Sequence, residues 1–325
     1  MPQDSPPVLI IRLDGIGDAL ALTPLLAALR SAGRPVDLVL REDNASAFSR
    51  AAVRDVAIAP FELRTNSAEN AAAIARFGVA LASRGYAAAL VATEDPAGYR
   101  LAVATAAPRR AGFANGWGKP LKTLWVRSLL TTTLYRPAGL DRRRRHECEV
   151  LFELGRGLVE ERVPTRELAR LRPLVLERDV VRHASVAVQV THKWERFGAD
   201  AGAVAQLLRE LAHQHPVRAI ASSSEGAFAD AVERAGGAAV ERFEALEPWK
   251  EAIAAAAMLV APDSGAVHVA GMVGTPTVAL FARRRDLAYQ VARWHPWAAP
   301  FFVVQIADDW IARTVAAVEE HAAAR

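Results

Sequence analysis

The chain has 325 residues, of which 52% are hydrophobic and 23% are charged, and its formal net charge is +4. This composition is typical of a folded protein and argues against disorder. The length exceeds what one hydrophobic core usually supports, so we expect two domains. A net charge of +4 is too small to indicate nucleic-acid binding. It fits an acidic small-molecule substrate and an anionic membrane surface equally well.

Cys148 is the only cysteine, which excludes an intramolecular disulfide and a thiolate zinc site. No stretch is long and apolar enough for a membrane span, and the opening residues lack a signal-peptide pattern. We therefore expect a soluble, cytoplasmic protein.

Strand and helix patterns alternate along the first half of the chain. Apolar runs predict strands at 8–12, 36–40, 56–59, 87–92 and 110–113. Helical spacing predicts a helix over the leucines between residues 20 and 29, and further helices at 68–83, 99–106 and 146–158. Residues 115–136 mix glycine, proline, tryptophan and basic side chains, which predicts a long functional loop. Residues 164–173 are typical of an interdomain connection.

The second half repeats this plan. Strands are expected at 185–190, 217–221, 258–261 and 277–281, and helices at 201–213, 225–235, 248–256, 267–273 and 308–324. Such alternation predicts parallel sheets. The sequence therefore predicts an α/β protein with two Rossmann-like domains, residues 1–172 and 173–325, facing each other across a ligand-binding cleft.

Residues 12–18, Arg-Leu-Asp-Gly-Ile-Gly-Asp, join the first predicted strand to the first helix. Gly15 and Gly17 would let a ligand approach the backbone at the carboxyl end of a parallel strand. Their spacing begins a dinucleotide fingerprint, but Leu20 stands where the third glycine belongs, which argues against NAD. Asp18 would lie in the first turn of the helix, either as a cap or as a reacting group.

Residues 260–268, Val-Ala-Pro-Asp-Ser-Gly-Ala-Val-His, run from a strand into a helix. The free amides of residues 264–266 would form a suitable binding site for a diphosphate. Asp263 would cap the helix or bind sugar hydroxyls or a cation. His268, one turn later, is either a structural hydrogen-bonding residue or part of the site.

Residues 191–197, Thr-His-Lys-Trp-Glu-Arg-Phe, follow the first strand of the second half. Lys193 or Arg196 could neutralise a phosphate, with Thr191 donating a hydrogen bond. The alternative is a solvated basic loop.

Together these segments resemble glycosyltransferase family 9. Residues 9–18, with Thr23-Pro24-Leu25, look like its amino-terminal signature. Residues 262–265, with His268 and the stretches 274–276 and 279–281, look like its carboxyl-terminal signature. Residues 146–155 are similar to the segment that leads into the interdomain region of the family. The resemblance spans about the whole chain, with the signatures in the expected order.

The resemblance implies a GT-B fold, no essential metal and inversion of the anomeric carbon. Consistent with this, the sequence contains no Asp-x-Asp motif. It implies that residues 1–172 bind the acceptor and residues 173–325 bind a nucleotide sugar, with the last helix, about 308–325, packing back on the first domain. No cofactor is expected beyond an ADP-sugar as donor substrate.

The same resemblance implies roles for individual residues. Asp18 would be the general base that deprotonates the acceptor hydroxyl. The donor would be held by Asp263, Ser264, Gly265 and His268, together with Thr191 and either Lys193 or Arg196. The acceptor would face Gly15, Gly17, Lys119 and Lys122.

The sequence departs from the family at one point. The family usually has a basic residue two positions before Trp-Pro, whereas here Glu195 follows Trp194, and Phe197-Gly198 fits that register equally well. Lys193 is our choice for the residue that neutralises the phosphates, with Arg196 as the alternative.

We therefore expect transfer of a heptose from ADP-heptose to an anionic, lipid A-linked inner-core lipopolysaccharide, with peripheral contact at the cytoplasmic face of the inner membrane. One alternative is a family 9 transferase with another nucleotide sugar or with a protein or glycan acceptor. A non-catalytic nucleotide-sugar binding protein is another, and a nicotinamide-dependent oxidoreductase is the last.

Overall fold

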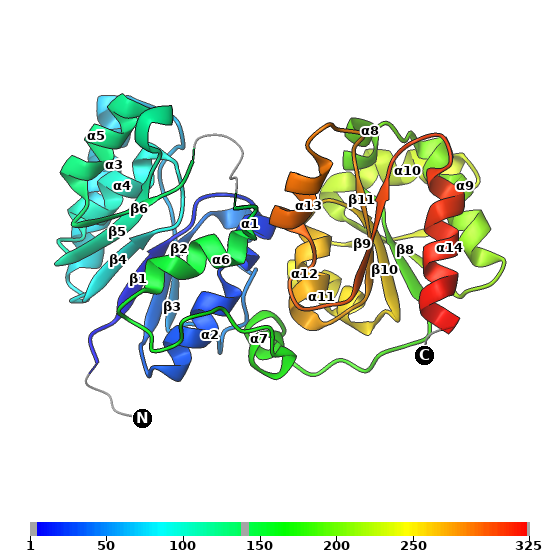
Figure 1. The fold of residues 1–325 in the computed structure, drawn as a ribbon, viewed down its shortest axis with the longest axis horizontal. Helices are drawn as coiled ribbons and strands as arrows, with labels where there is room; N and C mark the ends of the chain where they lie inside the picture. The colour runs from blue at the N-terminus through cyan, green and yellow to red at the C-terminus, as the bar shows by residue number, and fades with distance from the viewer. Residues whose placement is uncertain (1–4, 138–142, 324–325) are drawn as a thin grey trace. The chain divides into compact units, whose positions relative to one another are not determined.

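The computed structural model describes residues 5–137 and 143–323 (Figure 1). The chain forms two compact units, Met1–Thr165 and Arg166–Arg325. Each unit is a six-stranded sheet whose recorded strand pairs are all parallel, with helices on both faces. The predicted α/β class is confirmed. The boundary expected between residues 172 and 173 falls inside a helix of the second unit, α7 (Leu168–Val175).

The sheet of the first unit has the strand order β3-β2-β1-β4-β5-β6. Its strands are β1 (Val8–Ile11), β2 (Val36–Leu40), β3 (Asp55–Ile58), β4 (Ala88–Val91), β5 (Arg109–Ala114) and β6 (Thr132–Tyr135). Val8 is in register with both Val36 and Ala88. The order reverses direction between β1 and β4, so the loops after these two strands open at the topological switch point, where ligands usually bind.

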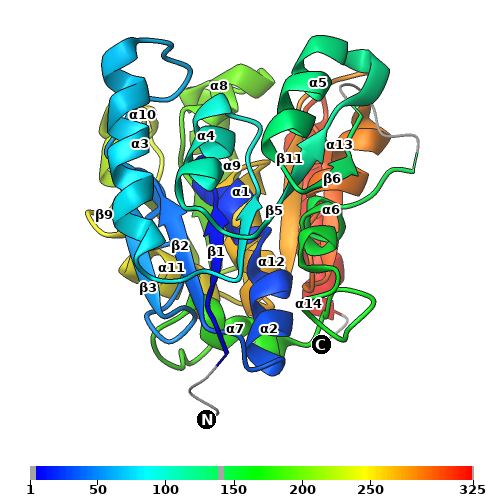
Figure 2. The same cartoon turned by 90° about the vertical axis from the view of Figure 1, so that its left-hand side faces the viewer.

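Helices cover both faces of this sheet. They are α1 (Ile16–Leu20), α2 (Thr23–Ser31), α3 (Ala68–Ala82), α4 (Pro96–Ala104), α5 (Pro120–Leu129) and α6 (Glu147–Phe152), with 3-10 turns η1 (Glu42–Asn44), η2 (Gly116–Gly118) and η3 (Glu153–Gly155). Leu9 and Ile11 point into a core shared with α3, α4 and α5. Helices α2 and α6 pack together on the other face. Figure 2 turns this unit toward the viewer and shows α3 beside α4.

The sheet of the second unit has the order β12-β11-β10-β7-β8-β9, which is the same arrangement. Its strands are β7 (Val186–Gln189), β8 (Val217–Ser222), β9 (Val240–Phe243), β10 (Met258–Pro262), β11 (Thr277–Phe281) and β12 (Phe301–Gln305). Here the switch point lies between β7 and β10.

The helices of the second unit also form two layers (Figure 1). Besides α7 they are α8 (Lys193–Phe197), α9 (Ala201–Ala212), α10 (Gly226–Arg234), α11 (Leu246–Ala255), α12 (Gly265–Val273), α13 (Leu287–Trp294) and α14 (Trp310–Ala323), with the 3-10 turn η4 (Ser223–Glu225). Helices α9, α10 and α14 share one core. Helices α11 and α7 both pack on α12. The final helix contacts α9, β11 and β12, and its packing on the first domain stays a prediction.

A cluster of charges holds the amino-terminal edge of the first sheet. The side chain of Asp37, in β2, is 1% exposed and accepts hydrogen bonds from Arg54 at 2.6 and 2.7 Å, Arg84 at 2.9 Å and the hydroxyl of Tyr86 at 2.8 Å. Burial raises the pKa of Asp37, but the bonds from Arg54, Arg84 and Tyr86 outweigh burial and leave it lowered. The cluster joins β2 to the chain segments before β3 and β4.

The prediction of a long loop at residues 115–136 is wrong. The structure has η2, α5 and β6 there. Pro120 occupies the first turn of α5, a position where its missing N–H costs nothing. The helical period is obscured because α5 is apolar on two sides: Val126 is buried, whereas Leu121 and Leu124 are exposed.

Smaller predictions also need correction. The helix expected over the leucines is two helices, α1 and α2, because a new helix begins at Thr23-Pro24. The helix expected at 146–158 is shorter, as α6 gives way to η3 at Glu153. The connection expected at 164–173 contains most of α7, and β9, α13 and β12 were not predicted.

Helices long and apolar enough to cross a bilayer are absent from residues 5–137 and 143–323.

Candidate functional site

In the first unit, the predicted segment 12–18 lies at the switch point. It follows β1, and the loop that follows β4 supplies Ala92, Glu94 and Asp95 beside it. The Arg12 side chain is only 2% exposed, and one of its amino groups donates to the carbonyl of Ala92, which joins the two loops. A guanidinium buried at this point has to be neutralised by carboxylates.

Three carboxylates surround Arg12. Its Nη2 donates to Asp18 Oδ1 at 2.9 Å, its Nε lies 3.5 Å from Asp14 Oδ2, and its Nη2 lies 3.8 Å from Glu147 Oε1. Glu147 is fully buried at the start of α6, where His146 caps the helix by accepting from the amide of Cys148. The Arg12 guanidinium therefore fixes the positions of the Asp14 and Asp18 carboxylates.

The charges continue along the carboxyl edge of the sheet. Arg136, directly after β6, lies 3.0 Å from Glu147 and 3.4 Å from Glu94. Glu94 in turn accepts from Lys122 of α5 at 3.0 Å. Burial raises the pKa of Glu94, but the hydrogen bond and charge of Lys122 and the charge of Arg136 outweigh it, so the pKa is lowered. One connected row of charges thus runs from Asp18 to α5.

Asp18 is the reactive candidate in this row. Its side chain is 39% exposed, its Oδ1 is fixed by Arg12, and its Oδ2 makes no hydrogen bond to the part of the chain that the structure describes. Gly15 is the N-cap of α1 with an ordinary φ of −68°. A Cβ added at Gly15 would meet nothing nearer than Asp18 Oδ2 at 4.0 Å, so the missing side chain leaves the approach to this carboxylate open. Gly17 lies in α1, one residue before Asp18.

Asp14 differs from Asp18 in its environment. Burial raises the pKa of Asp14, a shift that the nearby Arg12 charge opposes and the Asp18 charge reinforces. The site therefore contains one carboxylate that is drawn toward its protonated form and a second, Asp18, that is held by a charge-assisted bond.

The structure separates the two predicted acceptor lysines. Lys122 binds Glu94 and also donates to its carbonyl at 3.2 Å. Lys119 is exposed and precedes α5 as its N-cap. Of the pair, Lys119 is the one whose ammonium is open to solvent.

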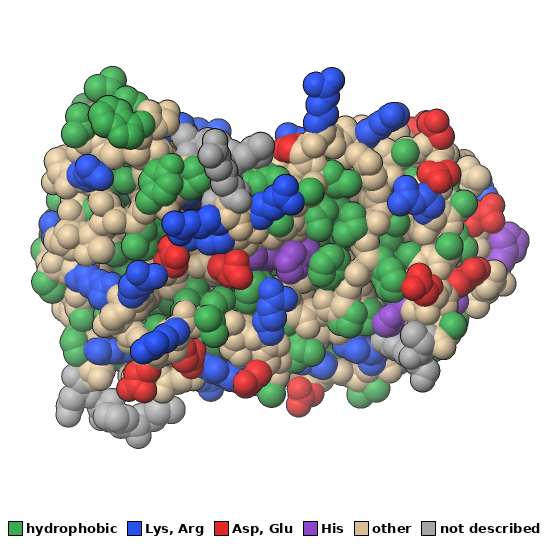
Figure 3. Space-filling view, viewed as in Figure 1, with side chains coloured by type: hydrophobic (Ala, Val, Ile, Leu, Met, Phe, Trp, Pro, Cys, Tyr) green, Lys and Arg blue, Asp and Glu red, His purple; other side chains and the backbone are tan. Residues whose placement is uncertain are grey.

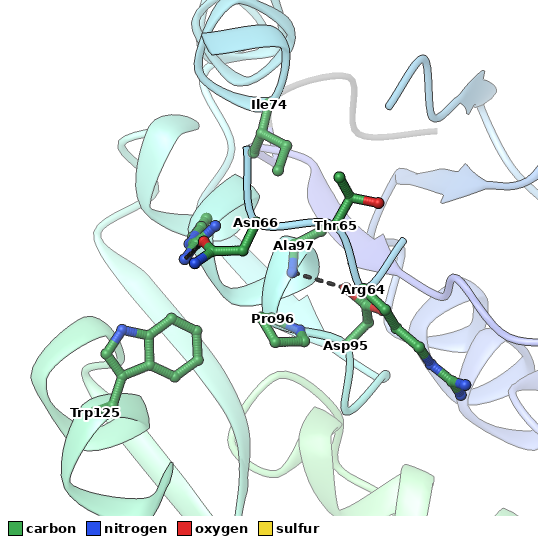
Figure 4. A pocket seen from close by; sticks show the side chains of 9 residues that line it. Arg64, Thr65, Asn66, Ile74, Asp95, Pro96, Ala97 and Trp125 are labelled. Atoms are coloured by element: carbon green, nitrogen blue, oxygen red, sulfur yellow. Dashed lines mark hydrogen bonds between the residues drawn. The ribbon is translucent and has the colours of Figure 1, made fainter. Parts of the chain in front are cut away.

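A cavity of about 310 Å³ lies in the same unit (Figure 4). Figure 4 shows Trp125 of α5 on one side of it, and Asp95 bonding the amide of Ala97 at the start of α4. Its remaining lining comes from Arg64, Thr65, Asn66, Ile74, Pro96 and Arg100. Arg64 has a positive φ of 59°, which is strained for a residue with a side chain.

In the second unit, two of the predicted segments meet at the other switch point. Residues 191–197 follow β7, and the loop 263–265 follows β10, the neighbouring strand. Lys193 Nζ donates to the carbonyl of Asp263 at 3.3 Å, so the ammonium lies beside the start of α12. Trp194 is buried beneath it and donates to the carbonyl of Gln189 at 2.7 Å.

The start of α12 has the features of an anion-binding site. Ser264 is its N-cap, but the side chain makes no capping hydrogen bond, and its buried Oγ has no partner among the described residues. Gly265 begins the helix without a side chain of its own. The first amides of α12 and the Ser264 hydroxyl are thus available to an anionic ligand at the positive end of the helix dipole.

The other predicted donor residues differ in their burial and in their hydrogen-bond partners. Thr191 donates to Glu225 at 2.8 Å, and Glu225 also accepts from the amide of His192 at 2.9 Å. His268 is buried in α12 and packs edge-on against Trp294 at 5.5 Å. Arg196 is exposed at the end of α8, so the geometry favours Lys193 over Arg196 as the phosphate partner.

Solved structures share this fold over nearly the whole chain. The chain matches E. coli heptosyltransferase WaaC with ADP at a TM-score of 0.71 and 20% identity, covering 96% of this chain and 98% of that one. E. coli ADP-heptose lps heptosyltransferase II matches at 0.70 and 15%, covering 97% and 98%. A family 9 glycosyl transferase from Veillonella parvula DSM 2008 matches at 0.68 and 15%, covering 98% and 91%.

Residues 245–309 match the model of glycosyltransferase family 9 (heptosyltransferase). The chain is thus similar to glycosyltransferase family 9 in this segment and in its fold. The matched segment contains β10, the loop 263–265 and α12, which form the candidate anion-binding site. No curated protein sequence matches the chain. The fold that the chain shares with these structures is GT-B, as the family resemblance implied.

The sequence did not reveal the supporting residues of the site in the first unit. Glu147 and Arg136 complete the row of charges, yet no spacing links them to Arg12, since they come from different elements. The available signal for Glu147 was its place directly after the histidine cap, in a helix that ends in the apolar residues Val150, Leu151 and Phe152. Within residues 5–137 and 143–323, no His, Cys, Asp and Glu side chains gather in a group of three or more that could hold a metal ion.

Proposed function

We propose that this chain is a family 9 glycosyltransferase that transfers a heptose from ADP-heptose to an inner-core, lipid A-linked lipopolysaccharide in the cytoplasm. The observation that carries the proposal is the start of α12, where Ser264 Oγ has no hydrogen-bond partner in the described parts of the chain and Lys193 lies beside the loop. Both groups suit a diphosphate, which is what a nucleotide-sugar donor presents. Two solved structures of E. coli heptosyltransferase WaaC contain ADP and ADP-2-deoxy-2-fluoro heptose.

The reaction needs a base, and we assign this role to Asp18. Its carboxylate would take the proton of an acceptor hydroxyl as the hydroxyl oxygen attacks the anomeric carbon. The bond from that carbon to the diphosphate oxygen breaks, ADP leaves, and the configuration inverts. The orientation of Asp18 by Arg12, with Oδ2 left unbonded, supports this role because a base must present a free lone pair to its proton.

The leaving group needs charge stabilisation, which we assign to the second unit. Lys193 and the amides at the start of α12 would bind the developing negative charge on ADP. We further propose that Asp263 and His268 contact the donor sugar, with Thr191 in support. The mechanism requires no metal ion. Gly15, Gly17, Lys119 and Lys122 remain our proposed acceptor residues.

The first test is calorimetric titration of the full chain with ADP, UDP, GDP and NAD, without added metal. We expect selective binding of ADP, followed by turnover of ADP-heptose with a lipopolysaccharide acceptor that lacks heptose. Preference for UDP or GDP would overturn the donor. Tight ADP-heptose binding without transfer to any acceptor would favour a non-catalytic binding protein, and binding of NAD alone would overturn the function.

A further inference from the structure

The outward side of α5 and of the turn before it is apolar. Trp117 is 96% exposed, Leu121 82% and Leu124 65%. Leu121 and Leu124 are three residues apart and lie along one side of α5, and Trp117 lies in the turn η2 just before the helix. Large apolar side chains grouped in this way on a protein surface mark an interaction site.

This side is held rigidly from beneath. Val126 and Thr123 are buried, and the Thr123 hydroxyl donates to the carbonyl of Gly116 at 3.0 Å, tying the turn to the helix. Trp125 packs edge-on against Tyr99 at 5.8 Å. The exposed apolar residues therefore have no room to fold into the core beneath α5, which is already filled.

The charges around this side are of one sign. Lys119 and Arg127 are exposed beside the apolar residues. The sequence has no aspartate or glutamate from residue 96 to residue 137. In Figure 3, hydrophobic side chains gather over the place where Figure 1 draws α5.

We propose that this surface, the α5 face (Trp117, Lys119, Leu121, Leu124 and Arg127), docks on an anionic lipid bilayer. Tryptophan and leucine flanked by cations are the composition of helices that lie in the bilayer interface, with the cations near the lipid phosphates. A second copy of the chain fits less well, because it would bring Lys119 and Arg127 against like charges with no acid on the same surface.

The α5 face is connected to the proposed base within the same unit. Lys122, on the inner side of α5, binds Glu94, and the row continues through Arg136 and Glu147 to Arg12 and Asp18. Docking through α5 would present this edge of the sheet to substrates carried by the bilayer. The binding itself rests on the α5 face alone and does not depend on the donor or the reaction.

The test is flotation of the full chain with vesicles of phosphatidylcholine alone and of equimolar phosphatidylcholine and phosphatidylglycerol. We expect binding to the anionic vesicles that weakens with salt. The affinity of the triple variant Trp117→Ser, Leu121→Ser, Leu124→Ser for the anionic vesicles should fall by about tenfold or more. Arg127→Glu should weaken binding to the anionic vesicles only.

A matched control removes three exposed valines from elsewhere: Val79→Ser, Val163→Ser and Val181→Ser. It should bind vesicles as the unmodified chain does, and the unfolding midpoints of both triple variants should be unchanged. No binding to anionic vesicles, or equal loss in both triple variants, would overturn the proposal. Self-association that disappears in the α5 triple variant, without vesicle binding, would assign the face to a second copy instead. Failure of ADP-heptose turnover would leave the vesicle result unaffected.

Discussion

The guanidinium of Arg12 donates to Oδ1 of Asp18 over 2.9 Å, while Oδ2 of Asp18 has no hydrogen-bond partner among the described residues. One oxygen is thus fixed and the other is open to a proton donor. The arrangement depends on burial, because a solvent-exposed arginine would lose much of this orienting effect to water and salt. Here the Arg12 side chain is 2% exposed and is shared with Asp14 and Glu147.

The first prediction separates the two aspartates. Asp18→Asn should lower the turnover rate by about a hundred to ten thousandfold, since the amide cannot accept the proton. Asp14→Asn should keep most of the activity, because burial raises the pKa of Asp14 and draws its carboxyl toward the protonated form, which cannot take a proton. Steady-state rates and ADP affinity would be measured for both. If Asp14→Asn loses the activity and Asp18→Asn keeps it, the base is assigned to the wrong residue.

The second prediction concerns the open space at Gly15. Gly15→Leu should raise the acceptor KM without unfolding the chain, because φ is −68° and the new side chain would project toward Asp18 Oδ2. Gly226→Leu is the matched control, since Gly226 also begins a helix and a Cβ there meets nothing within 4 Å. The acceptor and donor KM values of both variants would decide it. An unchanged acceptor KM in Gly15→Leu would show that the acceptor does not pass this glycine.

The third prediction decides between the two basic residues of α8. Lys193→Ala should weaken ADP binding by about tenfold or more, because a charge-assisted hydrogen bond contributes about 1.5–3 kcal/mol. Arg196→Ala should change ADP affinity by less than about threefold, as an exposed cation contributes little. Calorimetric titration of both variants measures this. The reverse order of effects would make Arg196 the donor residue.

The fourth prediction uses the unpartnered hydroxyl of Ser264. Ser264→Ala should leave the free energy of unfolding of the free chain unchanged or raise it, because the buried Oγ makes no hydrogen bond that could be lost. It should nevertheless weaken ADP binding by about tenfold. Asp200→Ala is the contrast: Asp200 caps α9 by accepting from Ala203 at 2.8 Å, so its loss should cost about 1 kcal/mol of stability and leave ADP affinity unchanged. Equal ADP affinity in Ser264→Ala and the parent chain would remove Ser264 from the donor site.

The elements with a clear period could be predicted from the sequence. The strands at 36–40 and 277–281 have the predicted bounds, because short apolar runs fully buried in a parallel sheet stand out from their flanks. The edge strand β9 gave no such signal. In β9, Val240 is buried, but the next two residues are exposed, so no run of apolar residues marks the strand.

The site could be predicted only in part. Asp18, Lys193 and Ser264 lie in contiguous segments after the strands that flank the switch points, so a linear pattern finds them. The Glu147–Arg136 pair could not be found in this way, because it exists only once β6 has joined the sheet beside β5 and α6 has packed on α2. Helix α5 was not predicted because Leu121 and Leu124 on its outer face are apolar but exposed. Its apolar residues therefore do not follow the period of one buried side.

The last prediction concerns acid stability and the cluster at the opposite, amino-terminal edge of the sheet. Asp37 has a lowered pKa because hydrogen bonds from Arg54, Arg84 and Tyr86 outweigh its burial. A carboxyl whose pKa is lower in the folded chain stabilises it above the unfolded value of 3.8, and this stabilisation is lost as the pH falls through the folded pKa. Asp37→Asn should therefore lower the free energy of unfolding at neutral pH by about 2 kcal/mol, since the partly exposed guanidinium groups of Arg54 and Arg84 lose their hydrogen bonds to a buried charge.

The control for this cluster is Asp55→Asn. Asp55 also pairs with Arg84, but its side chain is 45% exposed, so its loss should cost less than about 1 kcal/mol. Urea unfolding of the parent and both variants between acid and neutral pH measures the difference. The parent and Asp55→Asn should lose stability steeply below about pH 4, whereas Asp37→Asn should show a shallower decline because the titrating group is gone. Parallel pH curves for all three chains would show that Asp37 does not supply the acid-sensitive part of the stability.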